Sequence, residues 1–594
     1  MKKKKRVKNS LQKEEPLMKS ALEELRIKPT SSAEKKKFDF RDIFWNYPEF
    51  LISTFKKLIP ISYIVLFSII VLSVISFLKS DTFTEMIVGS QKKDTLIGGV
   101  VGSVNSLNPL FVTNSYIERS LDSLIFERFV YIDKNGEPLP GVAKSWEKKE
   151  KGLVYEFTID DSHYWHDGEK LTMDDIIFTF ETAIELSKEQ GFDSVGVAFA
   201  DMEIRKIDEN TVEFKVSEAS PTFFKAISIY IVPEKYLSEV DVSKMAFDSF
   251  SKQPIGSGKY EFVKMDSSSV YLIDNEYDRY NPVIKNIVFK MFSDEHSLET
   301  AFRTGSLDSF GSWDSKWSTY VDEYKNFTRY SKVIQDRQKQ ILFNTRKESL
   351  KNKDVRVALT LLLNKKDLVE ELGVGGEALN GPLPSSSSSW AYNKDVDFLE
   401  YNPSRAVELL KKLGYEKNES SGYFENSQGE ILTFTISYLS TDLNERIVDL
   451  LVDYYKEEGI FIKTESLDYE QMTQEIIATR NFELLLYEIE TSIDPDQYNL
   501  WHSLKVNFPD LNLSGYSYNR VDILLEEGRL SMDRDVRKQK YLLFQKYLMA
   551  DAPVIFLYSP QYEYIVRDNL VGIDFEKISH SYERFHNIEE WYWE

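Results

Sequence analysis

Apolar residues recur with two different periods along residues 94–594. Residues 173–189 and 445–459 have apolar side chains three and four positions apart, which predicts amphipathic helices. Residues 153–160 and 210–217 alternate apolar with polar side chains, which predicts strands with one buried face. The same patterns predict further helices at 354–364 and 403–414, and further strands at 95–104 and 431–439. Helices and strands alternate without a short internal repeat, so the expected fold class is α/β.

One segment departs from both periods because it is apolar throughout. The 21 residues between Lys57 and Lys79 include no charged side chain, and a helix of that length spans a hydrocarbon layer of ~30 Å. The alternative, a buried helix of a soluble core, fits the length and uniformity less well. We expect a single transmembrane anchor at 59–78 and a polar tether at 79–93. The small residues of a cleavage site are missing before Ser80, so we expect the anchor to be retained.

The charges on either side of this segment predict its orientation. Residues 1–58 contain 16 Lys and Arg against 8 Asp and Glu, whereas the remainder contains 58 against 88. By the positive-inside rule the basic tail, residues 1–58, is cytoplasmic and the body is extracytoplasmic on a cell membrane. Aromatic residues between 38 and 55 suit a segment at the lipid headgroups. The body has a net charge of −30 and would repel phosphate backbones, so nucleic acid is not an expected partner.

The search for catalytic signatures finds none that indicates an enzyme. The chain has no cysteine, no G-x-S-x-G, no phosphate loop and no H-E-x-x-H. Residues 373–378 match G-x-G-x-x-A, but they follow a helical stretch, which favours a glycine helix stop over a dinucleotide loop. His163 and His166 are interpreted as structural residues at a strand and turn, because no third ligand lies nearby. We therefore expect no catalytic residues, no cofactor and no metal.

Ten short phrases spread over the body carry a family resemblance. They lie at 106–110 (SLNPL), 137–147, 152–180, 253–263, 301–308, 354–376, 380–393, 402–415, 494–503 (DPDQYNLWHS) and 516–560. In content and order they resemble the family 5 extracellular solute-binding proteins, the receptors of peptide and nickel ABC importers. The resemblance covers about 94–575. It implies a two-lobed, periplasmic-binding-protein-like α/β body of type II and of the large peptide-binding class. Lobe one is expected at 94–340 plus 560–594, and lobe two at 341–559.

The resemblance also implies where a ligand binds. In peptide-binding relatives the ligand lies extended between the lobes and bonds to the main chain, like an added strand. The residues Tyr487-Glu488-Ile489-Glu490-Thr491, just before Asp494-Pro495, match the ligand-facing strand. The segment at 104–107, with Leu107 and the adjoining Asn108, matches the opposite wall. Candidate pocket aromatics, for which plain core packing is the alternative, are Trp313, Trp390, Tyr392 and Trp501.

Thr491 is a departure from the family pattern. Peptide binders usually have an Asp four residues before the proline, where it pairs with the peptide's α-ammonium, and here that position is Thr491. A buried ammonium without a counter-charge is costly. Glu490 points to the other face of a strand, and Asp494 is expected to serve the Asp-Pro turn. Either one reaches in by a local twist, or the ligand's amine stays solvated, or the ligand has no free amine. We favour the last two alternatives.

Together these observations predict a monomeric, membrane-anchored solute-binding protein. Its expected partners are a peptide or other extended small solute and an ABC transporter permease. One alternative is a receptor that signals through its transmembrane helix, although a tail of 58 residues has no room for an output domain. A more remote alternative is an extracytoplasmic hydrolase.

Overall fold

A computed structural model describes residues 94–594 except 112–114, 134–135, 191–201, 278–280, 314–325, 336, 385–388 and 492–493. The expected tail, anchor and tether, residues 1–93, lie outside the described residues. Among the residues that are described, no helix has both the length and the apolar character needed to cross a membrane.

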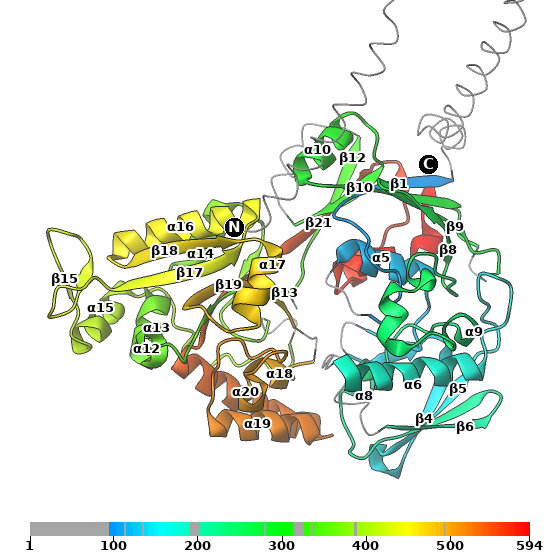
Figure 1. Ribbon diagram of the computed structural model, residues 1–594, viewed down its shortest axis with the longest axis horizontal. Coiled ribbons are helices and arrows are strands. Elements are labelled where there is room, and N and C mark those ends of the chain that lie inside the picture. Colours follow the sequence, from blue (N-terminus) through cyan, green and yellow to red (C-terminus); the bar gives the residue numbers. More distant parts are fainter. Residues whose placement is uncertain are drawn as a thin grey trace, which may run out of the picture. The chain divides into compact units, whose positions relative to one another are not determined.

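A seven-stranded sheet forms the centre of the first lobe (Figure 1). Its strands, in spatial order, are β12 (Phe327–Val333), β21 (Gln561–Arg567), β11 (Ser309–Ser312), β1 (Thr95–Val101), β10 (Asn286–Phe292), β9 (Ser269–Asp274) and β8 (Tyr260–Met265). The central strand β1 runs parallel to both β10 and β11. It is the strand predicted near residue 95.

Helices cover both faces of this sheet. Helix α5 (Tyr116–Ile125) begins at Ser115, whose hydroxyl accepts a hydrogen bond from Glu118 N. Its apolar face packs, through Leu121 and its neighbours, on the same core as the C-terminal residues 575–591. Helix α10 (Glu295–Arg303) packs against the opposite face through Phe302. The sheet is therefore buried on two sides, as expected for a core with central parallel strands.

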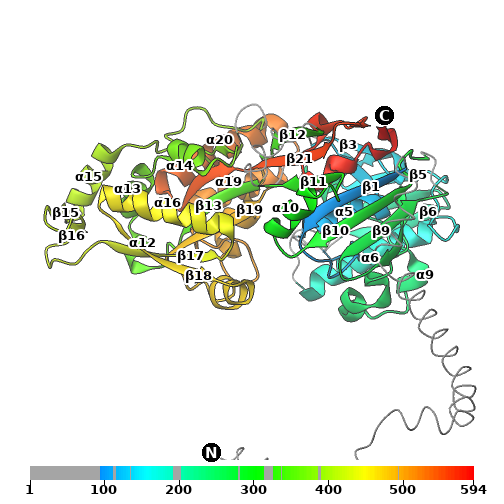
Figure 2. The ribbon, with the colours of Figure 1, turned by 90° about the horizontal axis from the view of Figure 1, so that it is seen from above.

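A smaller antiparallel sheet completes the first lobe (Figure 2). Its order is β4 (Ala143–Lys149), β5 (Val154–Ile159), β7 (Thr211–Lys215) and β6 (Glu203–Asp208). Helix α6 (Met173–Gln190) packs on it through Ile176 and Phe180. Thr172 Oγ1 accepts from Asp175 N at 3.4 Å, and Asp175 Oδ2 accepts from Thr172 N at 2.8 Å. This reciprocal capping confirms the predicted start of the helix. Short helices α8 (Phe223–Ala226) and α9 (Glu234–Leu237), and the ribbon of β2 (Val130–Ile132) with β3 (Pro138–Pro140), lie in the same region of the chain.

The second lobe is built on a six-stranded mixed sheet. Its order is β14 (Glu377–Ala378), β20 (Val554–Ser559), β13 (Arg337–Phe343), β19 (Leu484–Glu490), β17 (Thr433–Leu439) and β18 (Phe461–Leu467). Strand β17 is the one that the alternating run at 431–439 predicts. Every residue of β20 is buried, as befits a strand covered on both faces.

Two groups of helices cover the two faces of this second sheet. One core contains residues of α13 (Lys353–Leu361), α14 (Lys365–Leu372), α15 (Pro403–Lys412) and α16 (Asp442–Glu458). The other contains residues of α19 (Asn519–Leu530) and α20 (Arg534–Asp551). Helix α14 ends at Gly373, whose φ of +63° suits glycine. The glycine run at 373–376 is therefore the predicted helix stop.

The chain passes between the two large sheets twice. The first passage leaves β12 through Ile334 and leads to β13, and at the second Pro560 joins β20 to β21. We use "lobe one" for the described residues up to Val333 together with 561–594, and "lobe two" for residues 337–559. The two passages are adjacent in space, because Ile334 N donates to Pro560 O at 3.0 Å.

Candidate functional site

Strand β19 has strand neighbours along its whole length on only one side. On the β13 side, pairing runs from Arg337 opposite Glu490 to Phe343 opposite Leu484. On the β17 side, pairing is restricted to Leu484–Leu486. Within the described residues, no strand pairs with residues 487–490 on that second side. The C-terminal half of β19, which includes the predicted ligand-facing residues, therefore has an edge to which another extended chain can add.

Four charged side chains alternate along β13 and β19 where these strands approach lobe one. Glu488 lies opposite Lys339, and Glu490 lies opposite Arg337. Residues two apart on a strand share a face, so all four start from one face of the sheet. The Glu488 carboxylate accepts from Lys339 Nζ at 3.1 Å and is hydrogen bonded to the Arg337 guanidinium. Burial alone would raise the pKa of Glu488, but these two cations outweigh it and lower the pKa to about 2.

Arg337 also contacts lobe one. Its guanidinium lies 4.0 Å from the ring centroid of Trp313 and 4.5 Å from that of Tyr116, the first residue of α5. The two rings are themselves in contact, with centroids 5.3 Å apart. A guanidinium stacked on aromatic faces is a favourable cation–π arrangement. Trp313, predicted as a pocket aromatic, thus lies beside the charged end of β19.

The side chain of Glu490 points away from lobe two and contacts lobe one. Both of its carboxylate oxygens accept from Arg119 Nη1 of α5, at 2.7 and 2.8 Å. His580 Nδ1 lies 3.7 Å from the same carboxylate. The Arg119 guanidinium lies 5.5 Å from the ring centroid of Tyr582. Burial would lower the pKa of Arg119, but the charge of Glu490 raises it above its usual value. This ion pair joins β19 of lobe two to α5 of lobe one.

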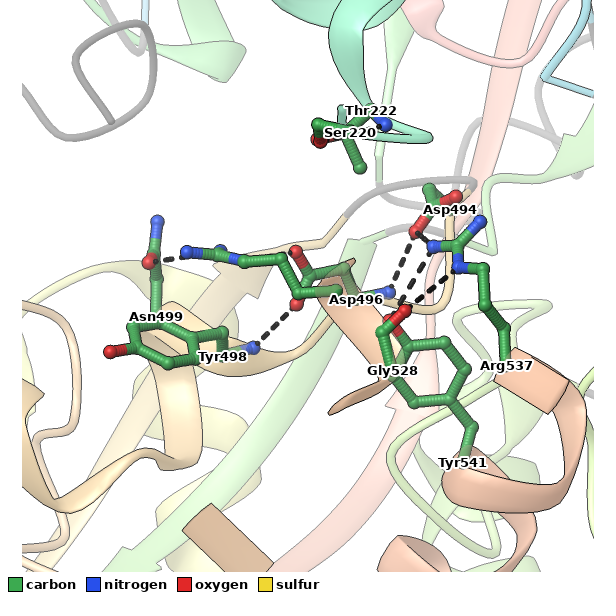
Figure 3. A network of polar contacts seen from close by, with 10 residues as sticks. Ser220, Thr222, Asp494, Asp496, Tyr498, Asn499, Gly528, Arg537 and Tyr541 are labelled. Atoms are coloured by element: carbon green, nitrogen blue, oxygen red, sulfur yellow. Dashed lines mark hydrogen bonds and ion pairs between the residues drawn. The ribbon is translucent and has the colours of Figure 1, made fainter. Parts of the chain in front are cut away.

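Asp494 belongs to a different polar network, which ties it to Asp496 and Arg537 of lobe two (Figure 3). Its Oδ1 accepts from Arg537 Nη2 at 2.6 Å and from Asp496 N at 3.0 Å. Arg537 Nε also donates to the carbonyl of Gly528 at 3.1 Å. The carboxylate thus stabilises the turn and ties it to α20, which is the turn role expected for it. The predicted aromatic Trp390 is next to this network, its ring centroid 5.4 Å from the Arg537 guanidinium.

Three of the other predicted site residues, Leu107, Asn108 and Trp501, are buried within the lobes. Leu107 is fully buried and its N–H donates to Ser251 O at 2.7 Å. Asn108 is 2% exposed, and its Nδ2 has no hydrogen-bond partner among the described residues. Trp501 is 2% exposed, and its Nε1 donates to Gln497 Oε1 at 3.1 Å. Tyr392 stacks on Phe398. The structure thus brings Trp313 to β19 and shows core packing for Leu107 and Trp501, whereas Tyr392 is half-buried.

Sequence reasoning missed three cations of the site, Arg119, Arg337 and Lys339. A signal was present for two of them, because Arg337-Gln338-Lys339 alternates charge at the start of a strand just as Glu488-Ile489-Glu490 does at the end of one. The sequence does not show that these segments lie opposite each other, because their register is known only from the folded sheet. Arg119 carried no comparable signal.

The two histidines singled out in the sequence are structural. The two ring nitrogens of His166 bond to the main chain of Gly256 and Gly258, each at 3.1 Å, and burial lowers its pKa to about 4. His163 Nδ1 lies 2.8 Å from the Glu127 carboxylate. Across the described part of the body, no group of three or more His, Asp or Glu side chains is arranged to hold a metal ion.

A cavity of about 810 Å³ lies apart from these residues. Lobe one lines it with Arg329, Gln561 and Glu563, and lobe two with α14 and residues 373–378. None of the predicted ligand residues lines this cavity. The glycine run brings main chain close to the Pro560 passage there, since a Cβ at Gly376 would lie 2.6 Å from Ser559 O.

The structure has two α/β lobes joined by two adjacent passages, and a free strand edge of lobe two lies next to residues of lobe one. These features define a two-lobed binding protein of the periplasmic type. The family model "Bacterial extracellular solute-binding proteins, family 5 Middle" matches residues 137–508, more than half of the chain. The chain belongs to this family, as its ten phrases predicted.

Individual relatives agree with this assignment. The chain is 24% identical over 514 residues to the oligopeptide-binding protein AppA of Bacillus subtilis, covering 84% of this chain and 92% of the relative. The crystal structure of NikZ from Campylobacter jejuni with Ni(L-His) has a TM-score of 0.73 at 26% identity, covering 84% and 99%. AppA from Bacillus subtilis with a nonapeptide has a TM-score of 0.72 at 23% identity, covering 84% and 99%. These likenesses confirm the two-lobed α/β fold.

Proposed function

We propose that this protein captures an extended solute, in the first instance an oligopeptide, between its two lobes. The ligand adds to the free edge of β19 through main-chain hydrogen bonds, and the lobes close over it by rotation about Ile334 and Pro560. Ligand contacts made only in the closed form shift the open–closed equilibrium. An ABC import permease then receives the closed form.

The observation that carries this proposal is the one-sided pairing of β19. Residues 487–490 are paired with β13 and have no strand partner towards β17 among the described residues. Unpaired main-chain groups at a strand edge are a template for an added chain. The edge lies next to residues of lobe one, because Glu490 pairs with Arg119 and Arg337 contacts Trp313.

The names of the relatives support a peptide without restricting the ligand to one. One relative is an oligopeptide-binding protein and another a dipeptide-binding protein, while a third is a nickel-binding periplasmic protein. A main-chain edge accepts any solute that presents amide-like groups in an extended form. Side-chain selectivity would then depend on the residues around the edge.

The proposal includes the membrane anchor. The apolar segment at 59–78 and the basic residues before it favour a single retained helix with the body outside the cell membrane. Intact mass of the mature protein tests this. We expect a mature chain that still includes residues 59–78, and a product beginning near residue 80 would contradict it.

Hydrogen exchange tests the capture of a peptide. The full chain in detergent would be incubated with a pool of random nonapeptides, and exchange measured in fragments covering 484–491. We expect slower exchange at residues 487–490 and little change at Leu484–Leu486, which already have strand neighbours on both sides. Unchanged exchange at a saturating peptide concentration, with no peptide recovered by mass spectrometry, would contradict the proposal.

A further inference from the structure

The three carboxylates at and just after the C-terminal end of β19 are each held by a cation of the protein itself. Glu488 is held by Arg337 and Lys339. Asp494 is held by Arg537. Glu490 is held by Arg119. A ligand on the free edge thus meets no carboxylate there whose charge is uncompensated.

Glu490 differs from the other two in accessibility and in the origin of its partner. Its side chain is 34% exposed, against 23% for Glu488 and 20% for Asp494. The cations of Glu488 and Asp494 belong to lobe two, whereas Arg119 belongs to α5 of lobe one. Glu490 is therefore the carboxylate that a ligand's ammonium group could reach when the lobes part.

The surroundings of the Arg119–Glu490 pair oppose such an exchange. Arg119 donates to both carboxylate oxygens, and its guanidinium is held over the Tyr582 ring. His580 stacks on Tyr582 and places a second titratable nitrogen 3.7 Å from Glu490. An incoming ammonium would have to displace a charge-assisted pair or lie beside a like charge.

We propose that Arg119 determines ligand specificity by binding the Glu490 carboxylate and compensating its charge. When the lobes close, the guanidinium fills the place that a ligand's terminal ammonium would take. The site then selects extended solutes without a free amine at that end, such as N-blocked peptides, over peptides with a free amine. This inference rests on the proposed function, since it requires an extended solute at the edge of β19.

A purely structural role for the pair makes a different prediction. If Arg119 and Glu490 only hold the lobes together, breaking the pair weakens the binding of all solutes by the same factor. If Arg119 acts on specificity, breaking the pair frees Glu490 for the ligand. The ratio of free-amine to blocked ligand retained by the protein then changes, whatever happens to the total amount bound.

The experiment measures that ratio directly. Full-length protein in detergent would be mixed with an equimolar pool of random nonapeptides, half of them N-acetylated, and the retained peptides quantified by mass spectrometry. We expect the wild-type protein to enrich the acetylated half. Arg119→Met should raise the free-amine share at least tenfold relative to the acetylated share, and Arg119→Gln should do the same while keeping a polar side chain. Arg119→Met combined with Glu490→Gln should lose that gain.

A matched control and two contradicting outcomes complete the design. Arg205→Met removes a comparable arginine–carboxylate pair, with Glu213, from the small sheet of lobe one, and it should leave the ratio unchanged. If peptides bind but the ratio stays within twofold of wild type in both Arg119 variants, the specificity role is wrong and the proposed function stands. If the wild-type protein retains neither half of the pool, the proposed function fails and this inference fails with it.

Discussion

Glu488 and Glu490 lie two residues apart on one strand, yet their carboxylates are held in different ways. Glu488 is bound by two cations of the neighbouring strand β13, one of which, Lys339, is only 8% exposed. Glu490 is bound by Arg119 of the other lobe in a more exposed pair. The first pairing is part of lobe two in any arrangement of the lobes. The second exists only while the lobes are together, so the same residue type pairs within one lobe at one position and between the lobes at the other.

The largest expected effect comes from removing the charge of Glu488, which pairs with the buried Lys339. Glu488→Gln keeps the shape of the side chain but leaves Arg337 and Lys339 without their counter-charge. Breaking a buried pair by removing one partner costs about 3–5 kcal/mol of the free energy of unfolding. Urea denaturation of the full chain in detergent measures this. Glu490→Gln is the matched control and should cost less than about 1 kcal/mol, because its pair is exposed. Equal losses in the two variants would remove the distinction between the carboxylates.

Acid should weaken the pairing of Glu488 with its two cations. The pKa of Glu488 in the folded protein is about 2, below its ordinary value of 4.5. Its contribution to stability is therefore complete above pH 4.5 and is lost as the pH falls towards 2. The wild-type protein should lose more stability than Glu488→Gln across this window, in denaturation curves measured at successive pH values. Parallel curves for the two proteins would show that the cations do not stabilise the ionised form.

A smaller effect is expected from the interlobe pair. A double-mutant cycle with Arg119→Met and Glu490→Gln should give a coupling energy of about 0.2–1 kcal/mol in the free energy of unfolding, typical of exposed ion pairs. Raising the salt concentration to about 1 M should reduce this coupling, because the Debye length falls to about 3 Å. A coupling energy that does not respond to salt would indicate that the pair is more buried than the 34% exposure of the Glu490 side chain implies.

The smallest expected effect is a change in the distance between the lobes. The chain has no cysteine, so Glu147→Cys on β4 and Lys411→Cys on α15 can be labelled with a fluorophore pair. Adding Glu490→Gln should shift the energy-transfer distribution of the ligand-free protein towards longer distances, because it weakens a contact of the closed form only. Glu488→Asp, which keeps the buried charge, is the control and should leave the distribution unchanged. If only the Glu488→Asp control showed longer distances, Glu488 rather than Glu490 would be the residue that holds the lobes together.

The sequence predicted helices and strands well, but it predicted strand register and ion pairs between distant residues poorly. The alternating run at 431–439 became β17, and the glycines after α14 became its helix stop, because both are decided by neighbours along the chain. The prediction of a ligand-facing strand rests on a family pattern before Asp494-Pro495. Its partner Arg119 lies 371 positions away, and nothing local distinguishes it from other arginines on amphipathic helices. The alternation at 337–339 was visible, but only the register of the sheet shows that it lies opposite Glu488 and Glu490.

The order of strands has a consequence for how the chain is made. Lobe two is one continuous stretch, residues 337–559, and every strand of its sheet is present once Ser559 has been synthesised. Lobe one is different, because β21 lies between β12 and β11 and begins at Gln561. A nascent chain emerging N-terminus first therefore finishes its second lobe while its first still has a gap between β12 and β11. Strand β21 closes that gap, so β11 and β12, which are made before lobe two, wait for their shared partner until lobe two is complete.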